Sequence, residues 1–138
     1  MRDAAYLEWR YVACPGLDYA ILVARRRWSR RTDALAVLRA GWIGEPIGAL
    51  VDWIVPRDEP GLERRLLLAC HRWCRERGLA RMVAWARPGS HADALLRSAG
   101  HVERESPFLL TVLRGHGTVG VEDMRDRWDY TIGDSDLF

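Results

Sequence analysis

Short apolar runs recur along the chain and predict the strands of a sheet. Most of the runs are rich in aliphatic side chains and are bounded by turn-forming or charged residues, which is the pattern of a β-strand in a globular protein. The runs lie at Tyr19–Ala24, Ala34–Arg39, Ile47–Val55, Arg81–Ala86, Val102–Glu105 and Phe108–Leu113. The third run is apolar at nearly every position, which predicts a central strand that is covered on both faces.

One residue of the third run, Asp52, departs from this apolar pattern. Strict alternation along the run places Gly48, Leu50, Asp52 and Ile54 on one face of the sheet and Ile47, Ala49, Val51, Trp53 and Val55 on the other. A carboxylate in the middle of a covered strand needs either a hydrogen-bonding partner or a chemical role. Asp52 is therefore a candidate functional residue.

Apolar residues at helical spacing predict one long helix, Pro60–Arg77, directly after the third run. Its apolar side carries Leu62, Leu66, Cys70, Trp73 and Cys74. Pro60 suits the first helical position, and Gly78 suits the position after the last. This is the strongest helix signal in the chain.

Weaker signals predict further helical segments. One is expected at Arg2–Tyr11, where Asp3 can cap the start, and another at His91–Ala99, where Ser90 can do the same. A charged run, Val121–Arg127, predicts one or two more helical turns.

The order of these elements predicts an α/β fold with a mixed sheet. The first two strands form an antiparallel hairpin, and the strand–helix–strand unit that follows is typical of a right-handed crossover between parallel neighbours. Helices are expected on both faces. At 138 residues the chain is long enough for a single domain, with a core in residues 1–114 that residues 115–138 complete or pack against.

The composition of the chain limits which classes of partner are expected, but it does not indicate a reaction. The net charge of +2 is close to balance and implies neither nucleic acid nor a membrane as a partner. All 21 basic residues are arginine, which indicates coding bias. The arginine-rich connection Arg25–Asp33 is therefore interpreted as a solvated hairpin tip in preference to an anion site. No apolar run is long enough to span a bilayer and no signal peptide opens the chain, so a cytoplasmic location is expected.

The three cysteines, Cys14, Cys70 and Cys74, predict reduced thiols and no metal site. An odd number without a framework of spacings argues against disulfides. Cys70 and Cys74 stand four residues apart on the apolar side of the long helix, with His71 between them. A metal would need further ligands at suitable spacing, and the sequence offers none, so both cysteines are interpreted as core residues.

Several short motifs, taken together with the order of elements, resemble a known family. They are Tyr6-Leu7-x-Trp9-Arg10-Tyr11, the spacing of Pro15 and Tyr19, Asp52-Trp53-x-Val55-Pro56, and Trp128-x-Tyr130-Thr131-x-Gly133-Asp134-Ser135-Asp136. The chain resembles the GNAT superfamily of acyl-CoA N-acyltransferases over nearly its whole length. More narrowly, it resembles the C-terminal half of a bacterial GNAT-like group with two such halves. Either an N-terminal half is missing here or the protein is a stand-alone version.

The resemblance implies a binding site for acetyl-CoA or another acyl-CoA as co-substrate. In the family the central strand splays from its parallel neighbour, pantetheine bonds to the exposed backbone, and the pyrophosphate lies on the N-terminus of the next helix. The phosphate cradle reads (Gln/Arg)-x-x-Gly-x-(Gly/Ala). The positions that match here are Trp53, Ile54 and Val55 on the strand and Arg57, Gly61 and Leu62 in the cradle.

The cradle of this chain departs from the family pattern. Pro60 and Leu62 stand where the two small residues belong, and Pro60 also lacks an N–H donor. Asp58 and Glu59 bring carboxylates to the place that a phosphate would occupy. Two interpretations stay open, a weakened phosphate cradle and a helix N-terminus that is capped by its own acidic residues.

The resemblance also identifies positions for proton transfer. Many family members carry a tyrosine in the short helix after the second parallel strand, where it protonates the departing thiolate. Leu96 occupies that position here, and nearby His101 could substitute for it or have no role. Asp52 matches the acid that often serves as the base, and its alternative is a structural carboxylate bonded to arginine or to backbone N–H groups.

Two functions therefore stay open at this point. The first is an N-acyltransferase that moves an acyl group, acetyl in the simplest case, to the amine of a small molecule or peptide, without a metal. The second is a catalytically degenerate module with a structural, substrate-binding or dimerisation role, acting as a homodimer or paired with a second GNAT-like half. The altered cradle and the absent tyrosine favour the second, and the seven tryptophans could anchor an interface.

Overall fold

A four-stranded mixed sheet organises the protein. The computed structural model describes residues 3–25, 32–41, 44–56, 59–105, 122 and 130–134. The chain packs as two compact units, residues 1–85 with 131–138 and residues 86–130, and each is described by itself. The runs at Arg26–Arg31 and Phe108–Leu113, most of Val121–Arg127, and both Arg57 and Asp58 lie outside the described residues.

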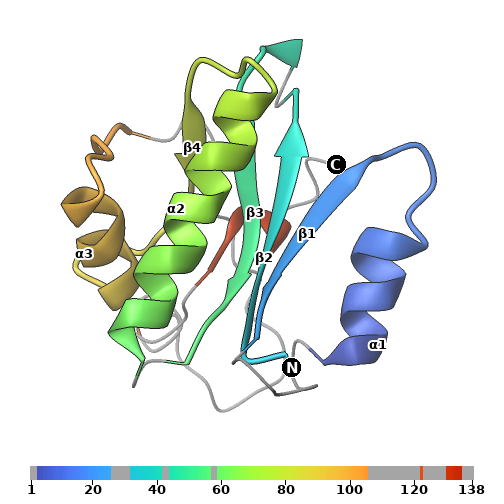
Figure 1. Cartoon of the computed structure of the whole chain (residues 1–138), viewed down its shortest axis with the longest axis horizontal. Helices are drawn as coiled ribbons and strands as arrows, with labels where there is room; N and C mark the ends of the chain where they lie inside the picture. Colours follow the sequence, from blue (N-terminus) through green and yellow to red (C-terminus); the bar gives the residue numbers. More distant parts are fainter. Residues whose placement is uncertain are drawn as a thin grey trace. The chain divides into compact units, whose positions relative to one another are not determined.

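The strands of the larger unit lie in the order in which they occur in the sequence (Figure 1). They are β1 (Tyr19–Ala24), β2 (Ala34–Ala40), β3 (Gly48–Ile54) and β4 (Met82–Ala84). The pairs β1–β2 and β2–β3 are antiparallel, and the pair β3–β4 is parallel. This confirms the α/β fold with a mixed sheet that the sequence predicts.

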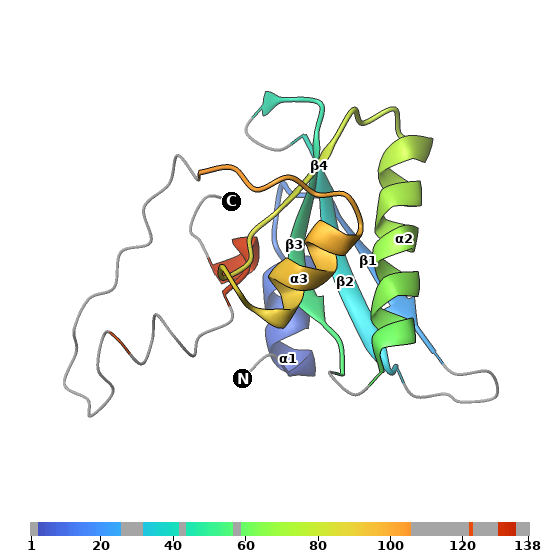
Figure 2. The ribbon, with the colours of Figure 1, turned by 90° about the vertical axis from the view of Figure 1, so that its left-hand side faces the viewer.

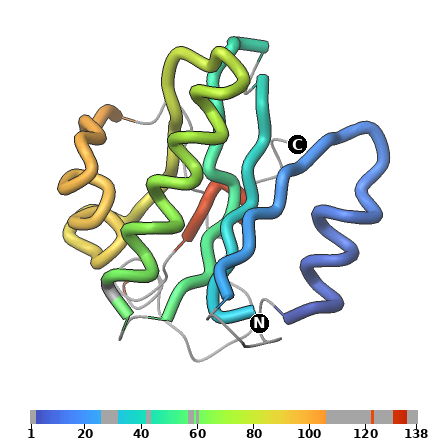
Figure 3. Tube along the Cα trace, in the orientation of Figure 1, coloured from blue at the N-terminus to red at the C-terminus, as the bar shows by residue number. Residues whose placement is uncertain are grey.

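Helix α2 (Pro60–Glu76) makes the crossover from β3 to β4, a path that Figure 3 traces along the chain. Its buried side chains include Leu62, Leu66, Leu67, Cys70 and Cys74, which confirms the predicted apolar side. Gly78 follows the helix with φ of 67°, a backbone conformation that glycine adopts without strain. The helix therefore begins and ends within one residue of the sequence prediction.

Helix α2 lies on one face of the sheet and the N-terminal segment covers the other, so helices lie on both faces (Figure 2). This segment starts as α1 (Ala4–Leu7), capped by the Asp3 carboxylate, which accepts from the N–H of Tyr6 at 2.9 Å. It then widens into the π-helix η1 (Glu8–Val12), closed by the N–H of Ala13, which donates to the carbonyl of Glu8 at 2.8 Å. The predicted single helix is therefore a helix with a wide second turn.

The smaller unit holds α3 (His91–Ser98), whose predicted cap is confirmed because Ser90 Oγ accepts from the N–H of Asp93 at 3.2 Å. The prediction of a strand at Val102–Glu105 is wrong, because these residues form no regular element. Only Val102 of the four is apolar, and it is 79% exposed, so the segment has no apolar face to bury in a sheet.

Candidate functional site

A β-bulge interrupts β3 at the point where the sequence places its candidate acid. Val37 of β2 pairs with Asp52, but the next residue, Leu38, pairs with Leu50, so Val51 is an extra residue in β3. An extra residue shifts the pleat by one position and turns the side chains that follow it to the other face. Bulges of this kind are common beside active sites.

The bulge corrects the predicted alternation along β3. Before the bulge, Gly48 faces α2, because a Cβ at this position would collide with Sγ of Cys74. After it, the Asp52 carboxylate faces the opposite side and bonds to Tyr11 of η1. The sequence placed Gly48 and Asp52 on one face, and the extra residue separates them.

The carboxylate of Asp52 is fully buried, with an exposed fraction of 0%, and at least three groups donate to it. The hydroxyl of Tyr11 donates to Oδ2 at 2.9 Å. The N–H of Trp53 donates to Oδ1 at 2.8 Å, and the hydroxyl of Thr131 lies 3.4 Å from the same oxygen. Both carboxylate oxygens are thus engaged by the protein itself, as burial of a charge requires.

Tyr11 is a neutral donor in this arrangement. Burial, followed by the negative charge of Asp52, raises the pKa of Tyr11 far above its ordinary value near 10. Its ring also packs edge-to-face against the ring of Tyr19 in β1, with centroids 5.1 Å apart. Tyr11 therefore holds Asp52 and the N-terminal segment in place at all ordinary pH values.

The C-terminal turn η3 (Ile132–Asp134) closes the same site. Its own geometry is fixed by the carboxylate of Asp134, which accepts from the N–H of Thr131 at 2.7 Å, and by Ile132, which is fully buried. The guanidinium of Arg10 donates to the carbonyl of Gly133 at 3.4 Å. Gly133 is packed so closely that a Cβ would collide with the Tyr11 hydroxyl and lie 3.1 Å from the carbonyl of Val51.

These contacts bring together three sequence motifs that are far apart in the chain. The N-terminal motif supplies Tyr11, the strand motif supplies Asp52, and the C-terminal motif supplies Thr131 and Gly133. We call these four residues the buried junction. Sequence reasoning singled out Asp52 alone as a functional candidate. The other three residues were noted in the motifs, but nothing in the sequence indicated that they meet.

Beyond the bulge, β3 loses its parallel neighbour. The pairing of β3 with β4 ends at Leu50 and Ala84, whereas β3 continues to Ile54, paired with β2 on its other side. Within the described residues, no strand pairs with the β4 side of this last part of β3. The predicted ligand-binding residues Trp53, Ile54 and Val55 lie here and are half-buried.

The start of α2 holds the other predicted ligand-binding residues. Gly61 is exposed, and the nearest atom to a Cβ built on it is Nη1 of Arg65, at 3.8 Å. Leu62 has a buried side chain, and its N–H donates to the carbonyl of Glu59 at 2.9 Å. The side chain of Glu59 makes no capping hydrogen bond, so the alternative of a self-capped helix gains no support from this residue.

The remaining candidates lie in the smaller unit. Leu96 is half-buried on α3, and the N–H of His101 donates to its carbonyl at 3.1 Å. This bond belongs to the turn that ends α3, so the position of His101 follows from the end of the helix. Its predicted role in proton transfer stays a prediction.

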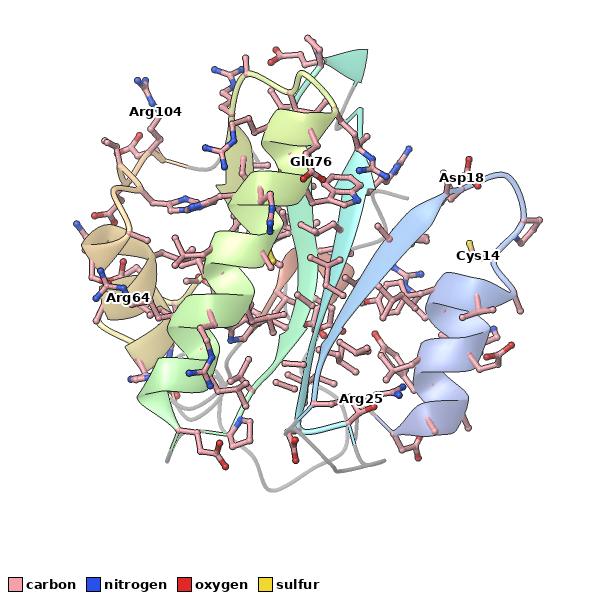
Figure 4. All side chains as sticks on the ribbon, viewed as in Figure 1. Cys14, Asp18, Arg25, Arg64, Glu76 and Arg104 are labelled. Carbon is pink, nitrogen blue, oxygen red and sulfur yellow. The ribbon has the colours of Figure 1, made fainter. Side chains whose placement is uncertain are left out.

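The described part of the chain carries neither a metal-binding cluster nor a membrane-spanning helix. Among these residues, no cluster of three or more His, Cys, Asp or Glu could hold a metal ion. Nor does any helix in the same residues combine the length and apolar character that a membrane span requires. Cys14 lies in the connection between η1 and β1 (Figure 4). Cys70 and Cys74 are buried on α2.

A comparison with solved structures supports the fold. A crystal structure described as that of a probable acetyltransferase superposes with a TM-score of 0.58, covering 70% of this chain and 70% of that chain at 18% identity. No protein-family profile and no curated protein matches the sequence. At this identity the likeness establishes a shared fold. The narrower resemblance to one half of a two-half protein stays a prediction.

Proposed function

We propose that the protein is an N-acyltransferase that binds an acyl-CoA, with acetyl-CoA as the simplest donor, and transfers the acyl group to an amine. The observation that carries this proposal is the end of the β3–β4 pairing at Leu50 and Ala84 while β3 continues to Ile54. A strand edge without a strand partner is a place where another extended, amide-containing chain can add. Pantetheine is such a chain.

The same strand leads directly into α2, whose N-terminus favours anions. In the proposed complex the backbone of Trp53 to Val55 binds the pantetheine, and the phosphates lie near Gly61, with Arg57 as their charged partner. Leu62 contributes through packing, because its side chain is buried and its N–H is already bonded to Glu59. The name of the structural neighbour agrees with this proposal, although only the fold is shared at that identity.

The proposed reaction is direct attack of the amine nitrogen on the thioester carbonyl. A bond forms between nitrogen and the acyl carbon, the carbon–sulfur bond breaks, and CoA leaves as the thiolate, which takes up one proton as the amine loses one. Holding both reactants at one strand edge lowers the entropic cost of this step. Asp52 was predicted as the base, directly or through water. Its complete burial argues against direct contact with the amine in this conformation.

The second candidate function, a module without catalysis, is favoured by one observation. Trp9, Val12, Ile21 and Val23 are large apolar residues of η1 and the edge strand β1, and their exposed fractions range from 38% to 67%. Exposed apolar residues that lie on neighbouring elements are typical of interaction surfaces. A homodimer, or pairing with a second GNAT-like half, would cover them.

Calorimetric titration with acetyl-CoA, CoA and pantetheine tests the first proposal. Because a Cβ at Gly61 would lie at an ordinary contact distance, 3.8 Å, from Nη1 of Arg65, Gly61→Asp adds a negative charge to the start of α2 without a steric clash, and Gly61→Asn is its neutral control. We expect Gly61→Asp to weaken CoA binding by about tenfold or more and Gly61→Asn to change it far less. Pantetheine, which lacks the nucleotide phosphates, should bind all three proteins alike.

Absence of heat with every acyl-CoA tested, including long-chain donors, would reject the acyltransferase proposal. The module proposal would then be examined by light scattering, with Ile21→Ser as the variant that disrupts the exposed surface. A monomer that binds no partner at any concentration would reject the dimerising version.

A further inference from the structure

The buried junction connects the predicted donor site to both ends of the chain. Asp52 adjoins the bulge on its own strand, Tyr11 comes from η1, and Thr131 comes from the C-terminal turn. A buried carboxylate is stable only when donors surround it. The bulged part of β3 can therefore keep this conformation only while the N-terminal and C-terminal segments both supply their donors.

The junction also fixes two backbone groups of β3. Oδ1 of Asp52 holds the N–H of Trp53 at 2.8 Å. On the same strand, the carbonyl of Val51 lies beside Gly133, where an added Cβ would be only 3.1 Å from it. These groups belong to the part of β3 that has no parallel partner among the described residues. The conformation of this strand edge is thus set by contacts on the η1 face of the sheet.

We propose that the buried junction positions the β3 edge for acyl-CoA, so that Tyr11, Asp52, Thr131 and Gly133 are positioning residues of the donor site. This inference rests on the proposed function and assigns Asp52 a task other than proton abstraction. It also assigns the C-terminal turn to the binding site, although the turn is about 80 residues away from β3 in sequence.

Binding measurements separate a positioning role from a catalytic one. If Asp52 is only the base, Asp52→Asn abolishes acyl transfer and leaves the affinity for acetyl-CoA unchanged. If the junction positions the strand edge, Tyr11→Phe, Thr131→Val and Asp52→Asn each weaken acetyl-CoA binding, by about tenfold for the largest effect. Tyr11→Phe and Thr131→Val remove single hydroxyl groups and keep the shape of the side chain.

A matched control excludes a general effect of lower stability. Cys70→Ala removes a buried side chain from α2, and Cys70 makes no contact with the junction in any of the bonds described above. We expect Cys70→Ala to lower the melting temperature and to leave acetyl-CoA affinity within about twofold of the original protein. Titrations are run well below the melting temperature of every variant.

Amide hydrogen exchange provides a readout that does not need a ligand. Because the N–H of Trp53 is held by Asp52, its exchange should accelerate in all three junction variants and remain unchanged in Cys70→Ala. If Asp52→Asn does not fold, Thr131→Val is used in its place. This variant removes only the longest of the three bonds and should therefore disturb folding least.

The possible outcomes are distinguishable. Faster exchange at Trp53 together with weaker acetyl-CoA binding supports the inference. Variants that bind acetyl-CoA as the original protein does overturn it, whatever their stability. If the original protein binds neither CoA nor acetyl-CoA, the proposed function itself fails, and the junction then has no ligand to position.

Discussion

The two faces of β3 are stabilised by different kinds of interaction. On the α2 face, Gly48 lies against Sγ of Cys74 and the side chain of Leu79. On the η1 face, Asp52 accepts hydrogen bonds from the hydroxyl of Tyr11, in a distant segment, and from the N–H of the adjacent Trp53. The first face is stabilised by side-chain packing, which tolerates substitution by apolar residues of similar volume. The second is held by directional bonds that fail when one partner is lost. Variants on either face test this difference.

The largest effect is expected at Gly133, on the polar face. Gly133→Ala places a methyl group in collision with the Tyr11 hydroxyl and in tight contact with the carbonyl of Val51, so that the side chain or the turn must shift. We expect a loss of about 3 kcal/mol in the free energy of unfolding, measured by urea denaturation. Adding Tyr11→Phe removes one of the two obstacles, so the double variant should lose less than the sum. Strict additivity would contradict the close packing of the turn.

A smaller effect is expected for the matched change on the apolar face. Gly48→Ala directs its methyl group at Sγ of Cys74, and we expect a loss of about 2 kcal/mol. In the Cys74→Ala background the sulfur is absent, so the same substitution should cost about 1 kcal/mol less. A double-mutant cycle by urea denaturation measures this coupling. Coupling near zero would mean that α2 shifts freely away from β3.

The last effect is a dependence of stability on pH that is absent at neutral pH and appears only in alkaline solution, and each face contributes at least one group to it. Burial, followed by the proximity of Cys74, raises the pKa of the Cys70 thiol from 9.0 to about 12. On the other face, burial and then Asp52 raise the pKa of Tyr11. In the unfolded chain both groups release their protons at lower pH than in the folded protein. The stability from these groups is therefore complete at neutral pH and is lost as pH rises.

For Cys70 the loss should run from about pH 9 to about pH 12, at about 1.4 kcal/mol per pH unit. For Tyr11 it should begin near pH 10. Denaturation curves at pH 8, 9, 10 and 11 measure both contributions. Cys70→Ala should flatten the curve from pH 9 upward, and Tyr11→Phe should flatten it only above pH 10. Unchanged slopes in both variants would contradict the burial of these groups in the folded state.

The apolar face could be predicted from the sequence because its signals are local. The ends of α2, the caps Asp3 and Ser90 and the strands β1 to β4 all follow from residues that are neighbours in the sequence. The error at Val102–Glu105 has a local cause as well, since one valine among charged residues does not make a strand. The wide turn η1 was missed because a π-helix differs from an α-helix by only one residue in the spacing of its hydrogen bonds.

The polar face could not be predicted in the same way. Period-two alternation placed Asp52 beside Gly48, and the bulge at Val51 reversed this placement without any signal that single-sequence patterns carry. The donors to Asp52 come from Tyr11 and Thr131, at sequence separations of 41 and 79 residues. No periodicity reaches over such distances, so the sequence indicated that Asp52 needs a partner but not which residues supply it.

The sequence by itself determined the elements of this protein and their mixed α/β arrangement. Hydrophobic periodicity and capping residues involve positions that are close together in the sequence, so they can be recognised from the sequence alone. Only the tertiary structure decided the environment of Asp52 and the place of the C-terminal turn. A buried carboxylate can accept hydrogen bonds from any donors that the completed fold places beside it. Two of those donors, Tyr11 and Thr131, come from opposite ends of the chain and meet Asp52 only in the tertiary structure.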